Sequence, residues 1–181
     1  MLAFNLVLLL ALLGSCECKR LWTHELLEIH TYSEDESKIK LEARIERQGR
    51  YLVGISGSGD LQYDFDNTTL FEVIIHHSSS GSESDYKPLP MAVPKKRLVD
   101  LKKMYDDIVY PAMKDCSNMP QIEGDLLWPW PRDLYTFDMC NFDKGNLPEI
   151  MSEGYYKIFC TFSGEVNWSL SYLVYVKTKL I

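Results

Sequence analysis

The sequence has no excess of basic residues, and this absence narrows the classes of function open to the protein. Among 181 residues, Lys and Arg total 19 against 26 Asp and Glu, which gives a formal net charge of −7. A nucleic-acid binder needs a basic surface that displaces counterions from phosphate, so nucleic acid is not expected as a partner. The apolar share of 46% is enough for a packed interior and argues against global disorder.

The chain also lacks an apolar run of membrane-spanning length. Residues 1–13 are uncharged and apolar, but a helix needs about 20 such residues to cross the hydrocarbon core. The small residues Gly14, Ser15 and Cys16 follow, and small residues are typical next to the cleavage site of a signal peptide. We therefore predict a signal peptide over residues 1–18 and a secreted, extracellular single domain over residues 19–181, without an integral membrane segment. An uncleaved anchor is the alternative.

Closely spaced cysteine pairs are missing as well. Beyond residue 18 the chain has Cys116, Cys140 and Cys160, so it contains no C-x-x-C metal or redox pair. In a secreted protein, three cysteines predict one disulfide and one leftover thiol, which is either free or paired between chains. Another cleavage site would retain one or two more cysteines, so the residues alone leave the pairing open.

Signatures of catalysis are few. Residues 54–58 read GISGS and miss the second glycine of a nucleophile elbow. His76 and His77 are neighbours on an expected strand and would point to opposite faces, which disfavours a shared metal ion. Asp64 and Asp66 share a face and could bind calcium or act as acid and base, but a solvated turn explains them more simply. We predict no enzymatic activity, no cofactor and no metal.

Two N-x-S/T triplets are candidate glycosylation sites in a secreted chain. They begin at Asn67, in a polar stretch, and at Asn167, at an expected turn between strands.

Alternation of apolar and polar side chains predicts a mainly antiparallel β protein. The expected strands cover residues 22–32, 38–46, 51–56, 70–77, 134–139, 155–162 and 168–179. Residues 57–60 are expected to end the third strand, and the serine-rich residues 78–85 to form a mobile loop. In the last strand one face carries Trp168, Leu170, Tyr172, Val174 and Val176.

One segment has helical periodicity. Apolar residues recur at the three-and-four spacing of a helix face from about Arg97 to Met113, with charged residues opposite. The sequence thus predicts an antiparallel β-sandwich or cup of about seven strands, with one amphipathic helix packed against it.

The most conspicuous feature is the supply of aromatic side chains. Trp128 and Trp130 alternate with prolines in a segment that cannot join a sheet ladder. They either cap a core or form the lip of an apolar cavity, in which a β-cup encloses one small lipid-like ligand.

The order and spacing of several C-terminal segments resemble those of a known family, the insect chemosensory B (CheB) proteins. These are secreted relatives of the ganglioside activator protein in the lipid-recognition (ML) superfamily. The segments are Cys116-Ser117-Asn118-Met119-Pro120, the Tyr135-to-Cys140 strand, Leu147-Pro148, Gly154-Tyr155-Tyr156-Lys157-Ile158 and Gly164-Glu165-Val166.

This resemblance implies a hydrophobic pocket inside a β-cup and no catalytic residues. It implies a lipid-like ligand of the cuticular hydrocarbon or glycolipid type and a role in contact (gustatory) pheromone sensing. It also suggests a Cys116–Cys140 disulfide, although this chain has fewer cysteines than the ganglioside activator. The pocket candidates are Phe71, Val73, Phe137, Phe159, Trp168 and Tyr172, with Trp128 and Trp130 as the lip.

Two other functions remain open from the sequence. The protein could dock to a sensory receptor or channel ectodomain without carrying a ligand, in which case the aromatic side chains would fill a core. It could also present lipid to an enzyme, as the ganglioside activator does.

Overall fold

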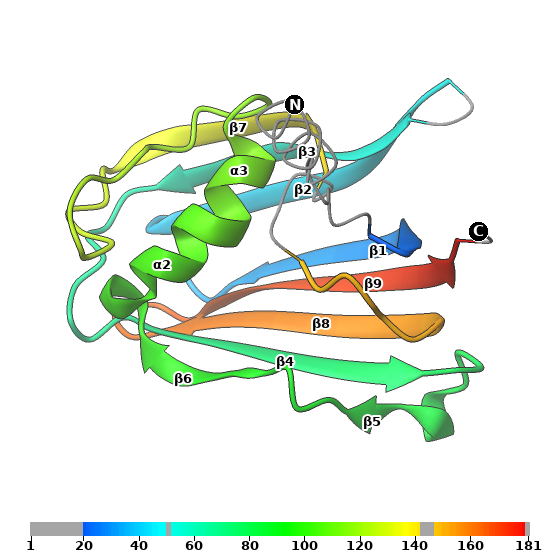
Figure 1. Ribbon diagram of the computed structural model, residues 1–181. Helices are drawn as coiled ribbons and strands as arrows, with labels where there is room; N and C mark the ends of the chain where they lie inside the picture. Colours follow the sequence, from blue (N-terminus) through cyan, green and yellow to red (C-terminus); the bar gives the residue numbers. More distant parts are fainter. Residues whose placement is uncertain (1–19, 50–51, 142–146, 180–181) are drawn as a thin grey trace, which may run out of the picture.

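A computed structural model of the chain describes residues 20–49, 52–141 and 147–179, and the expected signal peptide over residues 1–18 lies outside them. The described strands form two antiparallel sheets that face each other (Figure 1). The large sheet has the order β1-β9-β8-β4-β5, with β6 also paired to β4, and the small sheet has the order β2-β3-β7. This architecture confirms the predicted β-sandwich with one helix.

The strand bounds follow the predicted ranges closely, and two short strands are added. The large sheet consists of β1 (Trp22–Ser33), β4 (Leu70–Ser78), β5 (Lys87–Pro88), β6 (Val93–Arg97), β8 (Gly154–Ser163) and β9 (Trp168–Thr178). The small sheet consists of β2 (Ile39–Gln48), β3 (Leu52–Leu61) and β7 (Asp133–Cys140). The sequence reading missed β5 and β6, because proline is poorly compatible with a strand interior and is tolerated only at an edge.

The expectation that residues 57–60 end the third strand was wrong, since β3 continues to Leu61. The glycines there serve close backbone approach rather than a turn. A Cβ atom at Gly57 would lie 1.9 Å from the Glu42 carbonyl oxygen of the paired strand β2. A side chain at this position would therefore separate the two strands.

The predicted helix is present as one continuous helical segment. It consists of the 3-10 turn η2 (Leu98–Leu101), α2 (Lys102–Met104), the π-helical turn η3 (Tyr105–Val109) and α3 (Tyr110–Met113). Within it, the Tyr110 N–H donates to the Tyr105 carbonyl, five residues back. The next residue, Pro111, has no N–H to give, and a π-turn is one way for a helix to absorb that loss.

The helix closes one long side of the sandwich. It crosses in front of the space between β7 and β6, whereas β1 and β2, which belong to different sheets and are joined by residues 34–38, lie behind it (Figure 1). Its buried side chains are Leu98, Val99, Leu101, Tyr105 and Ala112. A disulfide joins Cys116, just beyond α3, to Cys140 at the end of β7, as the resemblance suggested. No helix in the described ranges is long and apolar enough to cross a membrane.

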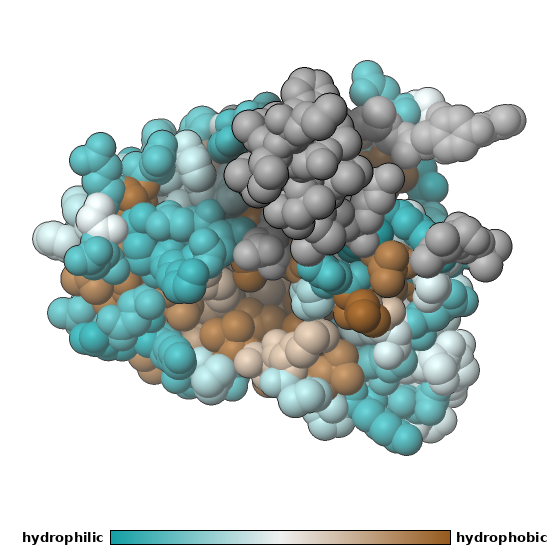
Figure 2. All heavy atoms as spheres, in the orientation of Figure 1, coloured by the Kyte–Doolittle hydropathy of each residue, from teal (hydrophilic) through white to brown (hydrophobic). Residues whose placement is uncertain are grey.

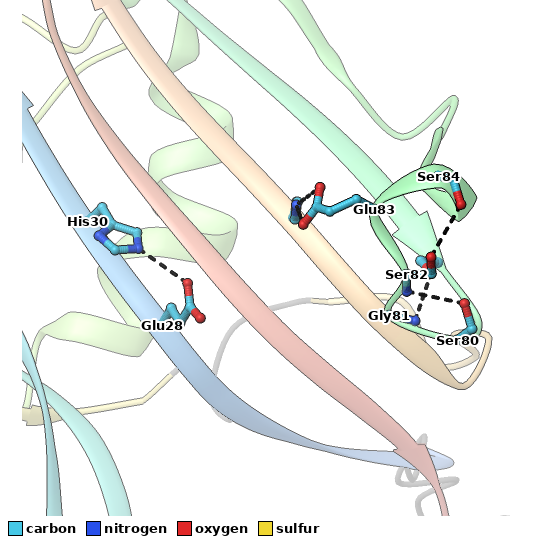
Figure 3. A network of polar contacts seen from close by, with 9 residues as sticks. Glu28, His30, Ser80, Gly81, Ser82, Glu83 and Ser84 are labelled. Carbon is cyan, nitrogen blue, oxygen red and sulfur yellow. Dashed lines mark hydrogen bonds and ion pairs between the residues drawn. The ribbon is translucent and has the colours of Figure 1, made fainter.

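The serine-rich segment after β4, expected to be a mobile loop, is a turn closed by hydrogen bonds. The hydroxyls of Ser78, Ser79 and Ser80 donate to Asp85 Oδ2 at 3.2, 3.2 and 3.0 Å. Backbone N–H groups of the turn donate to the Ser78 and Ser80 hydroxyls (Figure 3). These bonds to the charged form lower the pKa of Asp85, the bond from Ser80 contributing most.

Candidate functional site

The face of the large sheet that looks toward the small sheet is apolar over most of its length. The strand register stacks its side chains in rows across β4, β8 and β9. From one end to the other, these rows are Phe71-Phe162-Trp168, Val73-Cys160-Leu170, Ile75-Ile158-Tyr172 and His77-Tyr156-Val174. The shared face that alternation predicted for β9 is therefore confirmed, and it belongs to a much wider surface.

One end of this surface is fully packed. Phe71 and Trp168 are each 6% exposed, and the rings of Phe162 and Trp168 stack with their centroids 3.5 Å apart. The Trp168 indole N–H donates to the Tyr63 hydroxyl at 2.9 Å, so its polar atom is satisfied inside the core. Burial raises the pKa of Tyr63 to about 12. The helix side chains Leu98, Leu101 and Tyr105 belong to the same buried cluster.

The other end is packed by a second, smaller cluster. Trp22, Tyr156 and Val176 are each 3% exposed or less. The Trp22 indole N–H donates to the Pro148 carbonyl at 2.9 Å, and the Tyr156 hydroxyl donates to the Ser152 carbonyl at 2.7 Å. Residues 147–153, which precede β8, therefore cover this end.

The surface between the two clusters is apolar but only partly covered. The buried residues form one large cluster and a small second one, and partly buried side chains between them pack against one cluster or the other. We call the intermediate zone the belt. Each of its members lies on the inner face and keeps some accessible surface: Val73, Ile75, Ile158, Cys160, Leu170, Tyr172 and Val174. Figure 2 shows brown residues gathered in a hollow in the middle of the molecule, with polar residues around them.

Opposite the belt, one row of the small sheet combines two small residues, Ala43 and Gly57, with Phe137. Thr31 is paired with Leu170 in the large sheet and donates from its hydroxyl to the Leu41 carbonyl in the small sheet, at 3.1 Å. This hydrogen bond places Leu41 of the small sheet opposite the row of the large sheet that contains Leu170. Ala43, two residues further along β2 and paired with Gly57, is then opposite the next row, which contains Tyr172. Phe137 is therefore the large side chain of this row, whereas Ala43 and Gly57 add little bulk toward the belt.

The belt carries no charged side chain and has only two polar or polarisable groups. Burial raises the pKa of the Cys160 thiol to about 12, and it also raises the pKa of the Tyr172 phenol. Both groups therefore sit where water solvates their charged forms poorly, although both side chains keep accessible surface.

The structure brings together some of the predicted pocket residues and separates others. Val73 and Tyr172 are in the belt, and Phe137 follows buried Tyr135 by two residues, on the same face of β7. Phe71 and Trp168 belong to the packed end instead. Phe159 does not join them: it is on the outer face of β8, paired with Ile74 and 39% exposed.

The two tryptophans predicted as a lip have different environments. Trp128 is 56% exposed. Trp130 packs into the core, with its ring centroid 5.2 Å from that of Tyr105 and 5.9 Å from that of Phe65. Only Trp128 is therefore free to act at an edge of the protein.

The sequence reading missed five members of the belt: Ile75, Ile158, Cys160, Leu170 and Val174. Alternation alone placed Leu170 and Val174 on the face of Tyr172, so that signal was available. For Ile75 of β4 and for Ile158 and Cys160 of β8, the sequence did not reveal the pairing register. The register decides which side chains of these strands lie on the same face of the sheet as Tyr172.

Asp64 and Asp66, the candidate calcium or acid-base pair, each interact with a different partner. Asp64 accepts two hydrogen bonds from Arg132, each 2.7 Å long, whereas Asp66 accepts from the backbone and hydroxyl of Thr68. In the described part of the chain, no three His, Cys, Asp or Glu residues lie where they could hold a metal ion. The candidate glycosylation sites Asn67 and Asn167 are both exposed.

A polar hollow of about 410 Å³ lies at the far end of the small sheet. Glu46 and Asp138 border it, and the buried Ser56 hydroxyl lies 2.8 and 3.1 Å from their carboxylate oxygens. These distances describe a local hydrogen-bond cluster, and no group in it faces the belt.

The protein is a two-sheet β-sandwich whose inner face carries a belt of partly buried apolar side chains between two buried clusters. Residues 71–158, from β4 through the helix to β8, match the family described as "Protein of unknown function (DUF1091)". No curated protein sequence matches the chain.

Proposed function

We propose that this protein is a secreted, non-enzymatic binding protein that holds a hydrophobic or amphipathic lipid-like ligand against the belt. The observation that carries the proposal is the band of only partly buried apolar side chains on the inner face of the large sheet, between the two buried clusters. Apolar surface left uncovered inside a domain is costly in water, and a ligand removes that cost.

The position of the belt favours a small, flexible ligand over a macromolecule. The belt lies between the two sheets, so a protein partner has no access to it, whereas an alkyl chain can enter lengthwise. At about 25 cal/mol per Å², burial of a few hundred Å² of ligand surface is sufficient for micromolar affinity, even after the costs of association.

The biological setting that we propose rests on the resemblance to the chemosensory B proteins and the lipid-recognition superfamily. On this view the ligand is of the cuticular hydrocarbon or glycolipid type, and the protein acts in contact sensing of pheromones. The Cys116–Cys140 disulfide supports secretion, because such bonds persist mainly in oxidising compartments.

The proposal is tested by secreting the protein from insect cells, extracting it with organic solvent, and identifying copurifying lipid by mass spectrometry. We expect a lipid in near-stoichiometric amount, or uptake of long-chain hydrocarbons or glycolipids by the delipidated protein. Folded protein that carries no lipid and takes up none would contradict the proposal.

A second candidate function is docking to a receptor or channel ectodomain, and one observation favours it. On the outer face of the large sheet, Ile74 and Phe159 are direct cross-strand neighbours and are 38% and 39% exposed. If this pair docks to a receptor, Phe159→Ser should abolish receptor binding and leave lipid uptake unchanged. Equal receptor binding by wild type and variant would exclude this surface.

A further inference from the structure

The belt contains a single hydroxyl group, and its surroundings indicate which lipids the protein prefers. Tyr172 is in the middle row of the inner face, paired with Ile158 on one side and with Ile29 of β1 on the other. It belongs to neither buried cluster, whereas its strand neighbours Leu170 and Val174 each pack against one of them. The phenol ring therefore lies at the centre of the uncovered surface.

No hydrogen bond joins the Tyr172 hydroxyl to another described residue, and the fully buried unpaired side-chain atoms of the described residues are Ser33 Oγ and His76 Nδ1, so the Tyr172 oxygen keeps some accessible surface. The other core tyrosines are different: Tyr63, Tyr105 and Tyr156 each bond through their hydroxyls to a named partner. A phenol hydroxyl on an apolar inner face, with no partner among the described residues, gains a hydrogen bond when a ligand presents an acceptor atom to it.

The nature of the missing partner follows from the donor and the setting. A neutral phenol is a good hydrogen-bond donor, and its pKa is raised here, so the group keeps its proton. The belt has no cation that could pair with a carboxylate, so a fatty-acid anion would be desolvated without compensation. A neutral oxygen acceptor on a long apolar chain satisfies both conditions.

We propose that Tyr172 selects long-chain ligands that carry one neutral oxygen acceptor, such as a ketone or an ester, over plain hydrocarbons. This inference rests on the proposed function, since it specifies the ligand class of the same site. The apolar chain occupies the belt on both sides of the tyrosine, and the acceptor oxygen receives the hydrogen bond of the phenol.

The test compares octadecan-2-one with nonadecane, which have equal numbers of heavy atoms and differ by one carbonyl group. Each is delivered from cyclodextrin and measured by displacement of a fluorescent probe from the delipidated protein. We expect wild type to prefer the ketone, and Tyr172→Phe to weaken ketone binding about three- to tenfold while alkane binding stays the same. Tyr175→Phe is the matched control, because Tyr175 lies on the outer face of the same strand and its hydroxyl is near Glu153.

The outcomes separate the two proposals. Loss of ketone preference in Tyr172→Phe, with unchanged thermal stability, supports the role of Tyr172. Equal binding of ketone and alkane by wild type, or a ketone preference that survives in Tyr172→Phe, overturns that role and leaves lipid binding intact. If wild type binds neither compound nor any other lipid, the proposed function fails, and the inference about Tyr172 fails with it.

Discussion

Ile158 and Tyr172 face each other across β8 and β9, in the middle row of the belt, where Ile158 packs against the small cluster and Tyr172 belongs to neither cluster. One row away, Cys160 and Leu170 pack against the cluster beneath the helix. On the other side of the row, Val174 packs against the cluster at the far end. The proposed ligand would lie against this middle row.

Trp128 and Trp130 are two residues apart but should respond very differently to truncation. Trp130→Ala removes a ring packed against Phe65, Tyr105 and Tyr135, and we expect a loss of about 3–5 kcal/mol of unfolding free energy. Trp128→Ala removes a largely exposed ring and should change stability by no more than about 0.5 kcal/mol. Urea unfolding followed by circular dichroism measures both values, and equal losses would contradict the placement of Trp130.

Removal of the disulfide should loosen the attachment of the helix to the small sheet. Cys116 and Cys140 are separated by 24 residues, and closing such a loop contributes about 3.5 kcal/mol in the chain-entropy model. We therefore expect the double variant Cys116→Ser/Cys140→Ser to unfold at distinctly lower urea concentration, and a reducing agent to shift wild type in the same direction. Cys160→Ala is the control and should retain the full response to the reducing agent. An unresponsive wild type would show that the bond contributes little.

Cys160 should behave as a slow nucleophile whose reactivity depends on the folded state. Burial raises its pKa to about 12 from an ordinary value near 9, so at pH 8 the thiolate fraction is lower by about three orders of magnitude than in the unfolded chain. In the native protein, we expect alkylation by iodoacetamide to be slow and its rate to increase steadily up to pH 11. In urea-unfolded protein, we expect the rate to level off above pH 9. Mass spectrometry of the peptide that contains Cys160 measures this rate. Rapid native labelling at pH 8 would contradict the burial of the thiol.

The same shift predicts the direction of the pH dependence of stability. The folded state holds the Cys160 proton more tightly than the unfolded state does. Its contribution to stability is therefore complete below pH 9 and is lost as the pH rises from 9 to 12. Tyr63, whose pKa is raised from 10 to about 12, acts in the same direction over a slightly higher range. Thermal unfolding midpoints measured between pH 7 and 11 should be level up to pH 9 and then fall. A rise above pH 9 would contradict both shifts.

Much of the fold could be predicted from the sequence because its strands obey period two. The inner face of β9 and the apolar stripe of the helix follow directly from spacing, since both are set by local geometry. The assignment of Phe159 to the pocket failed because aromatic composition does not reveal the face of a strand. The pairing of Phe159 with Ile74 places both residues on the outside.

The belt could not be found from the sequence for a different reason. It is defined by an absence of packing, which depends on what the opposite sheet presents. The small residues Ala43 and Gly57 appear in the sequence as part of ordinary strands, and only the hairpin register places them across from Tyr172. Likewise, a run of serines predicts a loop, but only the folded turn shows that Asp85 accepts hydrogen bonds from three of them.

The most direct test of the central claim is to fill the belt. Leu170→Trp enlarges a side chain that points into the interior, and Leu173→Trp makes the same change on the outer face of the same strand. Lipid that copurifies with each protein is quantified by mass spectrometry, alongside the free energy of unfolding. We predict that Leu170→Trp stays folded, with stability within about 1 kcal/mol of wild type, and loses its lipid, whereas Leu173→Trp retains it. A folded Leu170→Trp protein that carries the wild-type amount of lipid would contradict the account. So would a wild type without lipid, combined with a loss of about 1–3 kcal/mol in Leu170→Trp, because it would show that the interior is already full.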